Sequence, residues 1–124
     1  MMKELEKKLQ YTYKNIEYLR TALTHSSYAN ESRGGKQSNE RLEFLGDAVL
    51  SIVVSDYLFL HCPHLPEGDL TKLRASLVCE KTLCRFSRSL GVGDFLRLSR
   101  GEQNSGGKDR PSILADAFEA IIAS

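Results

Sequence analysis

The chain has 124 residues, of which 41% are hydrophobic, so it is long enough for one compact domain with a single modest core. Its 17 Lys and Arg residues against 16 Asp and Glu residues give a net charge of +1, so any electrostatic recognition must be local. The three cysteines are an odd number and do not indicate a disulfide framework, and no long apolar stretch follows the charged N-terminal segment. We therefore expect a cytoplasmic protein with no membrane span.

Apolar residues at helical spacing occur along most of the chain, and no alternating pattern is long enough to predict a sheet. The expected helices cover residues 3–10, 15–26, 40–62, 70–78, 80–90 and 112–124. A polar stretch over 29–38 contains two glycines and predicts a loop, and the stretch 94–110 is expected to be irregular. The predicted fold class is all-α, a compact helical domain.

Several residues mark the ends of these helices. Ser38 or Asn39 can cap the long helix at its start, and two prolines stop it near residue 62. Asp69 can cap the helix that follows, and Gly91 is a typical C-terminal signal. Pro111 suits the first turn of the last helix.

The long helix carries acids inside an apolar run, NERLEFLGDAVLSIVV. On a helical wheel Glu40, Glu43 and Asp47 share an arc of about 60°. The same side continues down the helix through Leu50 and Val54, so at least its lower part is expected to be buried. Because a buried, unpaired carboxylate costs several kcal/mol, we expect something positive to face Glu43 and Asp47. The opposite side, expected to face the core, is formed by Leu42, Leu45, Val49, Ile52 and Val53.

The last predicted helix repeats this pattern. In SILADAFEAIIA the ionisable residues are Asp116 and Glu119, three apart and therefore on one face. A small core makes it plausible that the two acid pairs meet. Four carboxylates without histidine suit a hard divalent ion such as Mg²⁺ or Mn²⁺, whereas a di-iron bundle would need Glu-x-x-His.

Other polar residues have simpler interpretations. A single acid pair on a helix is usually a solvated face or a partner of Arg or Lys. The HCPH segment at 61–64 crowds its ligands into one turn, which does not favour a zinc site. Cys79 and Cys84 fit small core residues, and His25 fits a hydrogen-bonded structural role better than a catalytic one. The glycines of GEQNSGGK lack P-loop spacing and indicate a turn.

Five stretches, in order along the chain, resemble the bacterial ribonuclease III catalytic domain: ALTHSS, NERLEFLGDAVL, PEGDLTKLRASLV, SGG and SILADAFEA. The resemblance implies a Mg²⁺-dependent endonuclease that cuts double-stranded RNA and leaves 5′-phosphate and 3′-hydroxyl ends, in ribosomal and messenger RNA processing. It also implies a homodimer with one cutting centre per subunit, and Mn²⁺ is expected to substitute for Mg²⁺.

The resemblance also implies roles for particular residues. Glu43, Asp47, Asp116 and Glu119 match the metal-binding acids, and Asp47 and Glu119 are the expected catalytic pair. Glu40 and Glu67 match two further acids that line the cleft, and Phe44 matches an aromatic that inserts into the partner subunit. Expected phosphate contacts, from charge alone, are Lys72, Arg74, Arg97, Arg100, Lys108 and Arg110.

The chain departs from the family pattern at its end, because family members usually continue with more helices and a double-stranded-RNA-binding domain. We therefore expect 1–124 to be a catalytic domain cut short at its C-terminus, without the RNA-binding domain. Two other functions remain open. An all-α nucleotide pyrophosphohydrolase also holds Mg²⁺ with ExxE-type motifs and would hydrolyse free nucleoside triphosphates, and an RNA-binding scaffold of the same fold would not cut at all.

Overall fold

The structure is a computed structural model and describes residues 2–32 and 34–124. Over these residues it contains eight α-helices, two short 3-10 helices and no strand, and one isolated β-bridge joins Thr24 to Arg97. The predicted all-α fold class is confirmed. In chain order the elements are α1 (Met2–Leu9), α2 (Ile16–Ala22), α3 (Ser26–Glu31), α4 (Glu40–His61), α5 (Glu67–Val78), α6 (Glu80–Ser89), η1 (Val92–Phe95), α7 (Arg100–Asn104), η2 (Gly107–Asp109) and α8 (Pro111–Ala123).

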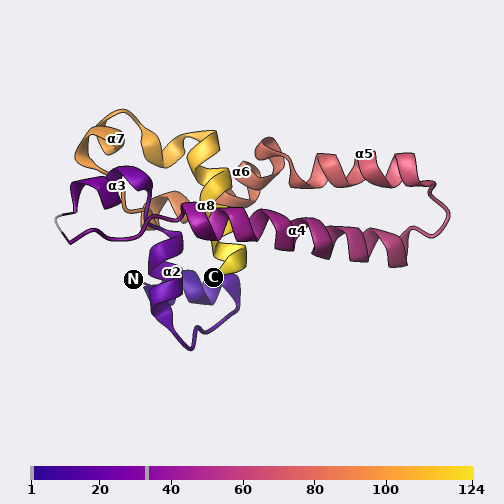
Figure 1. Cartoon of the computed structure of the whole chain (residues 1–124), viewed down its shortest axis with the longest axis horizontal. Helices are drawn as coiled ribbons and strands as arrows, with labels where there is room; N and C mark the ends of the chain where they lie inside the picture. The colour runs from indigo at the N-terminus through magenta and orange to yellow at the C-terminus, as the bar shows by residue number, and fades with distance from the viewer. Residues whose placement is uncertain (1, 33) are drawn as a thin grey trace.

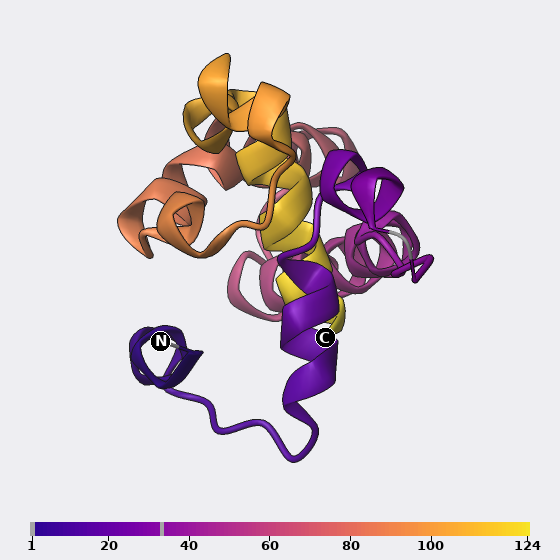
Figure 2. The ribbon, with the colours of Figure 1, turned by 90° about the vertical axis from the view of Figure 1, so that its left-hand side faces the viewer.

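Helix α8 runs through the middle of the molecule and packs most extensively against α4 and α6 (Figures 1 and 2). Seven of its 13 residues are buried, Glu119 among them. Its apolar side chains join one core with residues from α1, α2 and η1, including Leu5, Leu19 and Val92. A helix that is covered on most sides needs apolar residues all round, which explains the composition of this segment.

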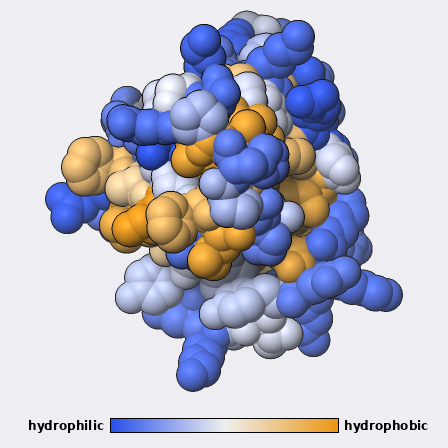
Figure 3. Space-filling view, turned by 90° about the vertical axis from the view of Figure 1, so that its right-hand side faces the viewer, coloured by the Kyte–Doolittle hydropathy of each residue, from blue (hydrophilic) through white to orange (hydrophobic). Residues whose placement is uncertain are grey.

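Helices α4 and α5 form a hairpin that extends away from the other helices (Figure 1). Arg74 of α5 joins the two helices by donating a hydrogen bond to Ser55 Oγ of α4 at 2.9 Å. Little of the hairpin is buried: α4 buries Gly46 and Leu58, and α5 has no buried residue. Viewed toward the end of the hairpin, the surface shows apolar side chains gathered between polar ones (Figure 3).

One side of α4 is apolar and uncovered, and we call it the outer face. Its six large side chains are between 50% and 79% exposed: Phe44, Leu45, Ile52, Val53, Phe59 and Leu60. The prediction that Leu45, Ile52 and Val53 face the core is therefore wrong. On the acid side Leu50 and Val54 are half-buried as expected, while Glu43 is half-buried and Glu40 and Asp47 are exposed. A wheel divides a helix into sides, but it does not say which of two apolar sides the rest of the chain covers.

Several predicted helix ends are confirmed. Helix α4 ends at His61 with Cys62 as its C-cap, and Pro111 occupies the first turn of α8. Gly91, with φ of +67°, follows the C-cap of α6. Asn39 is the N-cap residue of α4, but its side chain makes no capping hydrogen bond and instead donates to the Ala22 carbonyl oxygen. Ser38 Oγ accepts from the backbone N–H of Glu40 at 3.3 Å.

The predicted helix bounds and caps were wrong in three places. The segment predicted as one helix over 15–26 breaks after Ala22, and α3 forms within the end of that range and the predicted loop; Arg33 of this loop lies outside the described residues. Helix α5 begins at Glu67 with Pro66 as N-cap, so Asp69 lies in its first turn and does not cap it. The irregular stretch 94–110 contains α7, whose N-cap Ser99 accepts from Glu102 N at 3.1 Å, and η2. Cys79, expected to be a core residue, is also exposed, whereas Cys84 is buried as expected.

Tertiary pairing explains the break between α2 and α3. The backbone N–H of Asn39 donates to the Thr24 carbonyl oxygen at 2.8 Å, and that of His25 donates to the Arg97 carbonyl oxygen at 3.0 Å. These partners lie far along the chain from Thr24 and His25, so the local apolar pattern does not reveal them. The pairing also fixes the start of α4 against the end of α2.

Candidate metal and catalytic site

The two predicted acid pairs meet in the structure where α4 packs on α8. Carboxylate oxygens of Glu43, Asp116 and Glu119 all lie within 4.8 Å of one another. Glu119 is buried, with 7% of its surface exposed, while Asp116 is exposed and Glu43 is half-buried. Asp47 belongs to the same group because its side chain hydrogen-bonds to Glu119. The four acids that the sequence singled out are thus brought together.

Gly46 makes this arrangement possible. A Cβ atom at Gly46 would lie 1.7 Å from the Glu119 carbonyl oxygen and 2.5 Å from its carbonyl carbon. Any larger residue would push α8 away from α4 and separate the acids that the two helices carry. Gly46 was not singled out from the sequence, where the available signal was one glycine within a run of large apolar residues.

The acids raise one another's pKa values. Burial, a hydrogen bond from the protonated form to Asp47, and the charges of Asp47, Glu43 and Asp116 raise the pKa of Glu119 from 4.5 to about 8. Burial and the charges of Asp116, Asp47 and Glu40 raise the pKa of Glu43, and burial and the charge of Glu80 raise that of Asp116. Without a cation Glu119 therefore retains a proton at neutral pH.

Within the part of the chain that the structure describes, no basic side chain forms an ion pair with these acids. Among residues 2–32 and 34–124 the ion pairs are Arg20 with Glu17 and Arg110 with Glu102, so no Lys or Arg pairs with the four acids. The positive group expected to face Glu43 and Asp47 is therefore not a Lys or Arg of the described residues. Converging carboxylates without a basic partner are the arrangement that a bound cation stabilises.

The donor set fits Mg²⁺. All donors are carboxylate oxygens, which hard divalent ions prefer. Octahedral Mg²⁺ holds oxygens at about 2.0–2.1 Å, so opposite ligands lie about 4.2 Å apart. Small rotations of the exposed side chains would bring oxygens that now lie within 4.8 Å of one another to that spacing. Glu43, Asp116 and Glu119 could therefore hold one ion, with Asp47 beside Glu119 as a fourth ligand or a hydrogen-bond acceptor.

The acids expected to line the cleft lie in different places. Glu40 is close enough to Glu43 for its charge to raise the pKa of Glu43. Glu67 begins α5 and lines a hollow of about 260 Å³ with Phe59 and Arg74 in the outer part of the hairpin, away from the acid cluster. Glu80, the first residue of α6, lies near Asp116 and was missed in the sequence, because only the packing of α6 on α8 brings it there.

The six predicted phosphate contacts fall into two groups. Lys72, Arg100 and Lys108 are exposed. The guanidinium groups of the other three are held by the protein. Arg74 donates to Ser55, Arg97 donates to Thr24 Oγ1 at 2.6 Å and lies over the Tyr28 ring, and Arg110 pairs with Glu102. Arg97 therefore has a structural role in joining α2 and α3 to the segment before α7.

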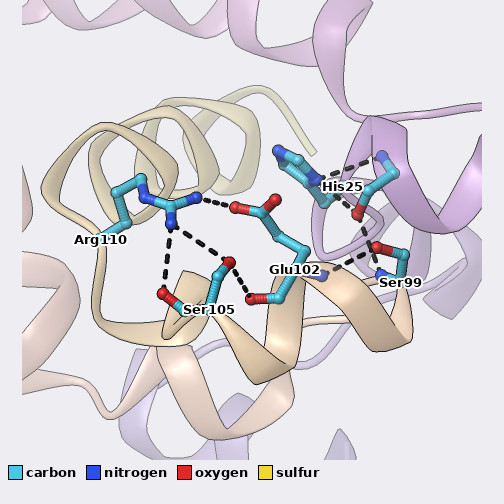
Figure 4. A network of polar contacts seen from close by, with 6 residues as sticks. His25, Ser99, Glu102, Ser105 and Arg110 are labelled. Atoms are coloured by element: carbon cyan, nitrogen blue, oxygen red, sulfur yellow. Dashed lines mark hydrogen bonds and ion pairs between the residues drawn. The ribbon is translucent and has the colours of Figure 1, made fainter.

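A polar network joins the caps of α3 and α7 and the start of α8 (Figure 4). His25 caps α3, because its Nδ1 accepts from the backbone N–H of Ser27 at 3.1 Å. Ser27 Oγ accepts from Ser99 N at 2.9 Å, and Ser99 in turn caps α7, which carries Glu102. The structural role expected for His25 is thus present.

Comparison with known proteins places these features in a family. Residues 15–124 match the family model described as ribonuclease-III-like. Ribonuclease 3 of Caldanaerobacter subterraneus subsp. tengcongensis is 53% identical over 124 residues, which are 100% of this chain and 54% of that protein. Ribonuclease 3 of Pelotomaculum thermopropionicum is 54% identical over 121 residues, which are 97% of this chain and 50% of that protein. The chain spans about half the length of the curated relatives it matches.

Solved structures give the same result. The nuclease domain of ribonuclease III from Campylobacter jejuni superposes with a TM-score of 0.92 and is 50% identical, and the match covers 99% of this chain and 82% of that one. That structure is described as showing flexibility in a region involved in dimer formation. The family model matches most of the chain, curated relatives are about half identical to it, and a solved nuclease domain shares its fold. The chain therefore belongs to the ribonuclease-III-like family.

Proposed function

We propose that the chain is a Mg²⁺-dependent endoribonuclease that hydrolyses phosphodiester bonds of double-stranded RNA in ribosomal and messenger RNA processing. The observation that carries the proposal is the meeting of Glu43, Asp47, Asp116 and Glu119 without a basic partner among the described residues. The family and the name ribonuclease 3 of the relatives support it. The products would carry 5′-phosphate and 3′-hydroxyl ends, and Mn²⁺ would replace Mg²⁺.

The charge of the four acids explains why an ion is required. RNA is a polyanion, so it is repelled by the four carboxylates until a cation neutralises them. A bound divalent ion lowers the pKa of water, polarises a phosphoryl oxygen and stabilises the leaving 3′ oxygen. Glu43, Asp116 and Glu119 would hold the ion, and Asp47 would orient Glu119 through their hydrogen bond.

Before the ion binds, the carboxyl group of Glu119 is protonated. Its pKa near 8 means that its carboxyl group retains a proton at neutral pH, and the hydrogen bond with Asp47 stabilises this protonated form. An ion can be bound only after that proton has left, so ion binding and proton release are coupled. The buried position of Glu119 limits the orientations of the carboxylate and so preorganises one ligand.

We also propose that the chain forms a homodimer through the outer face of α4. Six large apolar side chains at least half exposed on one helix are unusual for a monomer and typical of an interface. By length and composition alone α4 could also cross a membrane. Its opposite side, however, packs on α8 and carries Glu43 and Asp47, which a lipid environment would disfavour. A second copy of the chain could cover the apolar outer face of α4 and leave the acid-bearing side packed on α8.

The cytoplasm is the compartment that we propose. Cys62, Cys79 and Cys84 are all free thiols. Free cysteines persist in reducing compartments, of which the cytoplasm is one.

The test is incubation of the chain with an RNA duplex in Mg²⁺, Mn²⁺, Ca²⁺ or EDTA, with the ends of the products identified. We expect cleavage in Mg²⁺ and Mn²⁺ and binding without cleavage in Ca²⁺, which prefers a larger and looser shell. A single-stranded RNA of the same sequence should be spared. Cleavage in EDTA would refute the metal requirement. Hydrolysis of free nucleoside triphosphates would favour a pyrophosphohydrolase, and binding of the duplex without cleavage under any condition would favour a scaffold.

A further inference from the structure

The ring of His25 has one nitrogen that the fold uses and one that it does not. Nδ1 accepts from Ser27 N at 3.1 Å and lies 2.8 Å from Ser27 Oγ. Because Nδ1 accepts the backbone N–H, it is unprotonated, and in the neutral ring the proton must be on Nε2. Among the described residues Nε2 has no hydrogen-bond partner. The α3 cap thus fixes the tautomer and leaves one N–H donor free.

The surroundings of His25 keep the ring neutral and hold it in place. Burial lowers its pKa from 6.5, while the nearby charge of Glu40 raises the pKa and that of Arg110 lowers it. The backbone on both sides is fixed, since His25 N donates to the Arg97 carbonyl oxygen and the Thr24 carbonyl oxygen accepts from Asn39 N. The ring therefore lies beside the first turn of α4, near Glu40, whose charge also acts on Glu43 of the acid cluster.

Arg110 is the basic residue whose charge acts on His25. It is the N-cap residue of α8, the helix that carries Asp116 and Glu119. Its guanidinium pairs with Glu102 and donates to the Ser105 carbonyl oxygen at 3.3 Å, yet 41% of the side chain stays exposed (Figure 4). Glu102 is itself packed against Gly107, where a Cβ atom would lie 2.7 Å from Glu102 Cγ. Arg110 is thus held in one orientation with part of its charge accessible.

We propose that His25 contacts substrate: its Nε2–H donates to a phosphate of the RNA backbone that lies beside the acid cluster, and Arg110 supplies positive charge near the same phosphate. The proposal rests on the function proposed above. An RNA that approaches four carboxylates needs directional donors next to them, and a neutral imidazole of fixed tautomer provides one. Capping α3 and binding phosphate use different nitrogens, so one ring can do both.

Substitution by asparagine separates the two roles. Asn is among the best N-cap residues and can accept from Ser27 N, but its shorter side chain has no donor where Nε2 lies. His25→Asn should keep the melting temperature of the parent and lower kcat/KM on an RNA duplex in Mg²⁺ about tenfold or more, the effect of a lost hydrogen bond to a charged acceptor. His25→Ala should lose the same activity and also melt lower. His64→Asn, the same change at the exposed turn between α4 and α5, should match the parent in both.

Salt dependence distinguishes His25 from Arg110. Duplex binding in Ca²⁺ should keep its dependence on salt in His25→Asn, because a neutral ring releases no counterion. In Arg110→Gln the slope of log affinity against log salt should fall by about one. A direct measurement that needs no variant is the NMR signal of the His25 Nε2–H, which should shift when the duplex is added in Ca²⁺.

Three outcomes decide the proposal. A His25→Asn protein that cuts as well as the parent, or a Nε2–H signal that the duplex leaves unchanged, overturns it while the proposed function stands. A parent that neither binds nor cuts the duplex overturns both. Loss of cleavage in His25→Asn with unchanged melting and a shifted signal supports it.

Discussion

Gly46 of α4 and Glu119 of α8 are in direct backbone contact, so close that a Cβ atom on Gly46 would lie 1.7 Å from the Glu119 carbonyl oxygen. The contact places the buried carboxylate of Glu119 beside Glu43 and Asp47, on either side of Gly46 along α4. The geometry of the acid cluster therefore depends on a residue that has no side chain.

Gly46→Ala should disrupt both the fold and the cluster. The added methyl group meets helix backbone, which cannot rotate away as a side chain can, so the helices must separate. We expect the free energy of unfolding to fall by about 3 kcal/mol and Mg²⁺ affinity to fall with it. Thermal unfolding and a Mg²⁺ titration measure the two effects. Gly68→Ala is the control, because nothing lies within 4 Å of a Cβ there, and equal melting of the two variants would contradict the prediction.

The acid cluster could be predicted from sequence because its signal is local. Glu43 and Asp47, and likewise Asp116 and Glu119, stand out as charges within apolar helices whose period puts each pair on one side. Glu80 and Gly46 could not be found this way, because their importance appears only when α6 and α4 pack on α8.

The outer face of α4 shows a different limit of sequence patterns. Leu45 and Ile52 are as apolar as core residues, yet they are 50% and 70% exposed. Periodicity predicts a helix with apolar sides, but whether an apolar side meets the same chain or a partner depends on the arrangement of the other helices. The break between α2 and α3 is similar, because it depends on the pairing of Thr24 with Asn39.

Phe44→Ala should weaken self-association. Phe44 is 79% exposed on the outer face of α4 next to Leu45, and a buried aromatic anchor is typically worth about 2 kcal/mol or more at an interface. We expect the dimer dissociation constant to rise about 30-fold, as measured by sedimentation equilibrium. Tyr11→Ala, which removes an aromatic that is 57% exposed outside α4, should leave it unchanged. A Phe44 variant that dimerises as tightly as the parent would refute this role, as would a monomeric parent that binds lipid vesicles.

Stability without metal should depend on the protonation of Glu119. Its pKa is raised from 4.5 to about 8 in the folded protein, so between these values the folded state keeps a proton that the unfolded chain has lost. The free energy of unfolding should therefore decrease as pH rises from about 4.5 to about 8. Glu43 and Asp116, whose pKa values are also raised, act in the same direction.

Thermal unfolding of the parent and of Glu119→Gln in EDTA, across this pH range, isolates the effect. His25 and Cys79 have lowered pKa values and contribute pH dependence of their own, but they contribute equally in both proteins. The parent should lose stability relative to the variant as pH rises, and Mg²⁺ at pH 8 should restore the stability of the parent more than that of the variant. Parallel pH profiles would mean that Glu119 is ionised at neutral pH even without metal.

Glu119→Gln should also separate RNA binding from cutting. Gln keeps the size of the side chain and removes one negative charge, so ion affinity should fall, while the basic residues expected to contact phosphate are untouched. We expect duplex binding in Ca²⁺ to match that of the parent, and single-turnover cleavage in Mg²⁺ to slow by at least about 10²-fold, a loss of roughly 2.7 kcal/mol in transition-state stabilisation. High Mn²⁺ should restore part of the rate by mass action, and Glu4→Gln on the exposed side of α1 should behave as the parent. If binding collapses while the cutting step keeps its rate, Glu119 contacts the RNA and does not hold the ion.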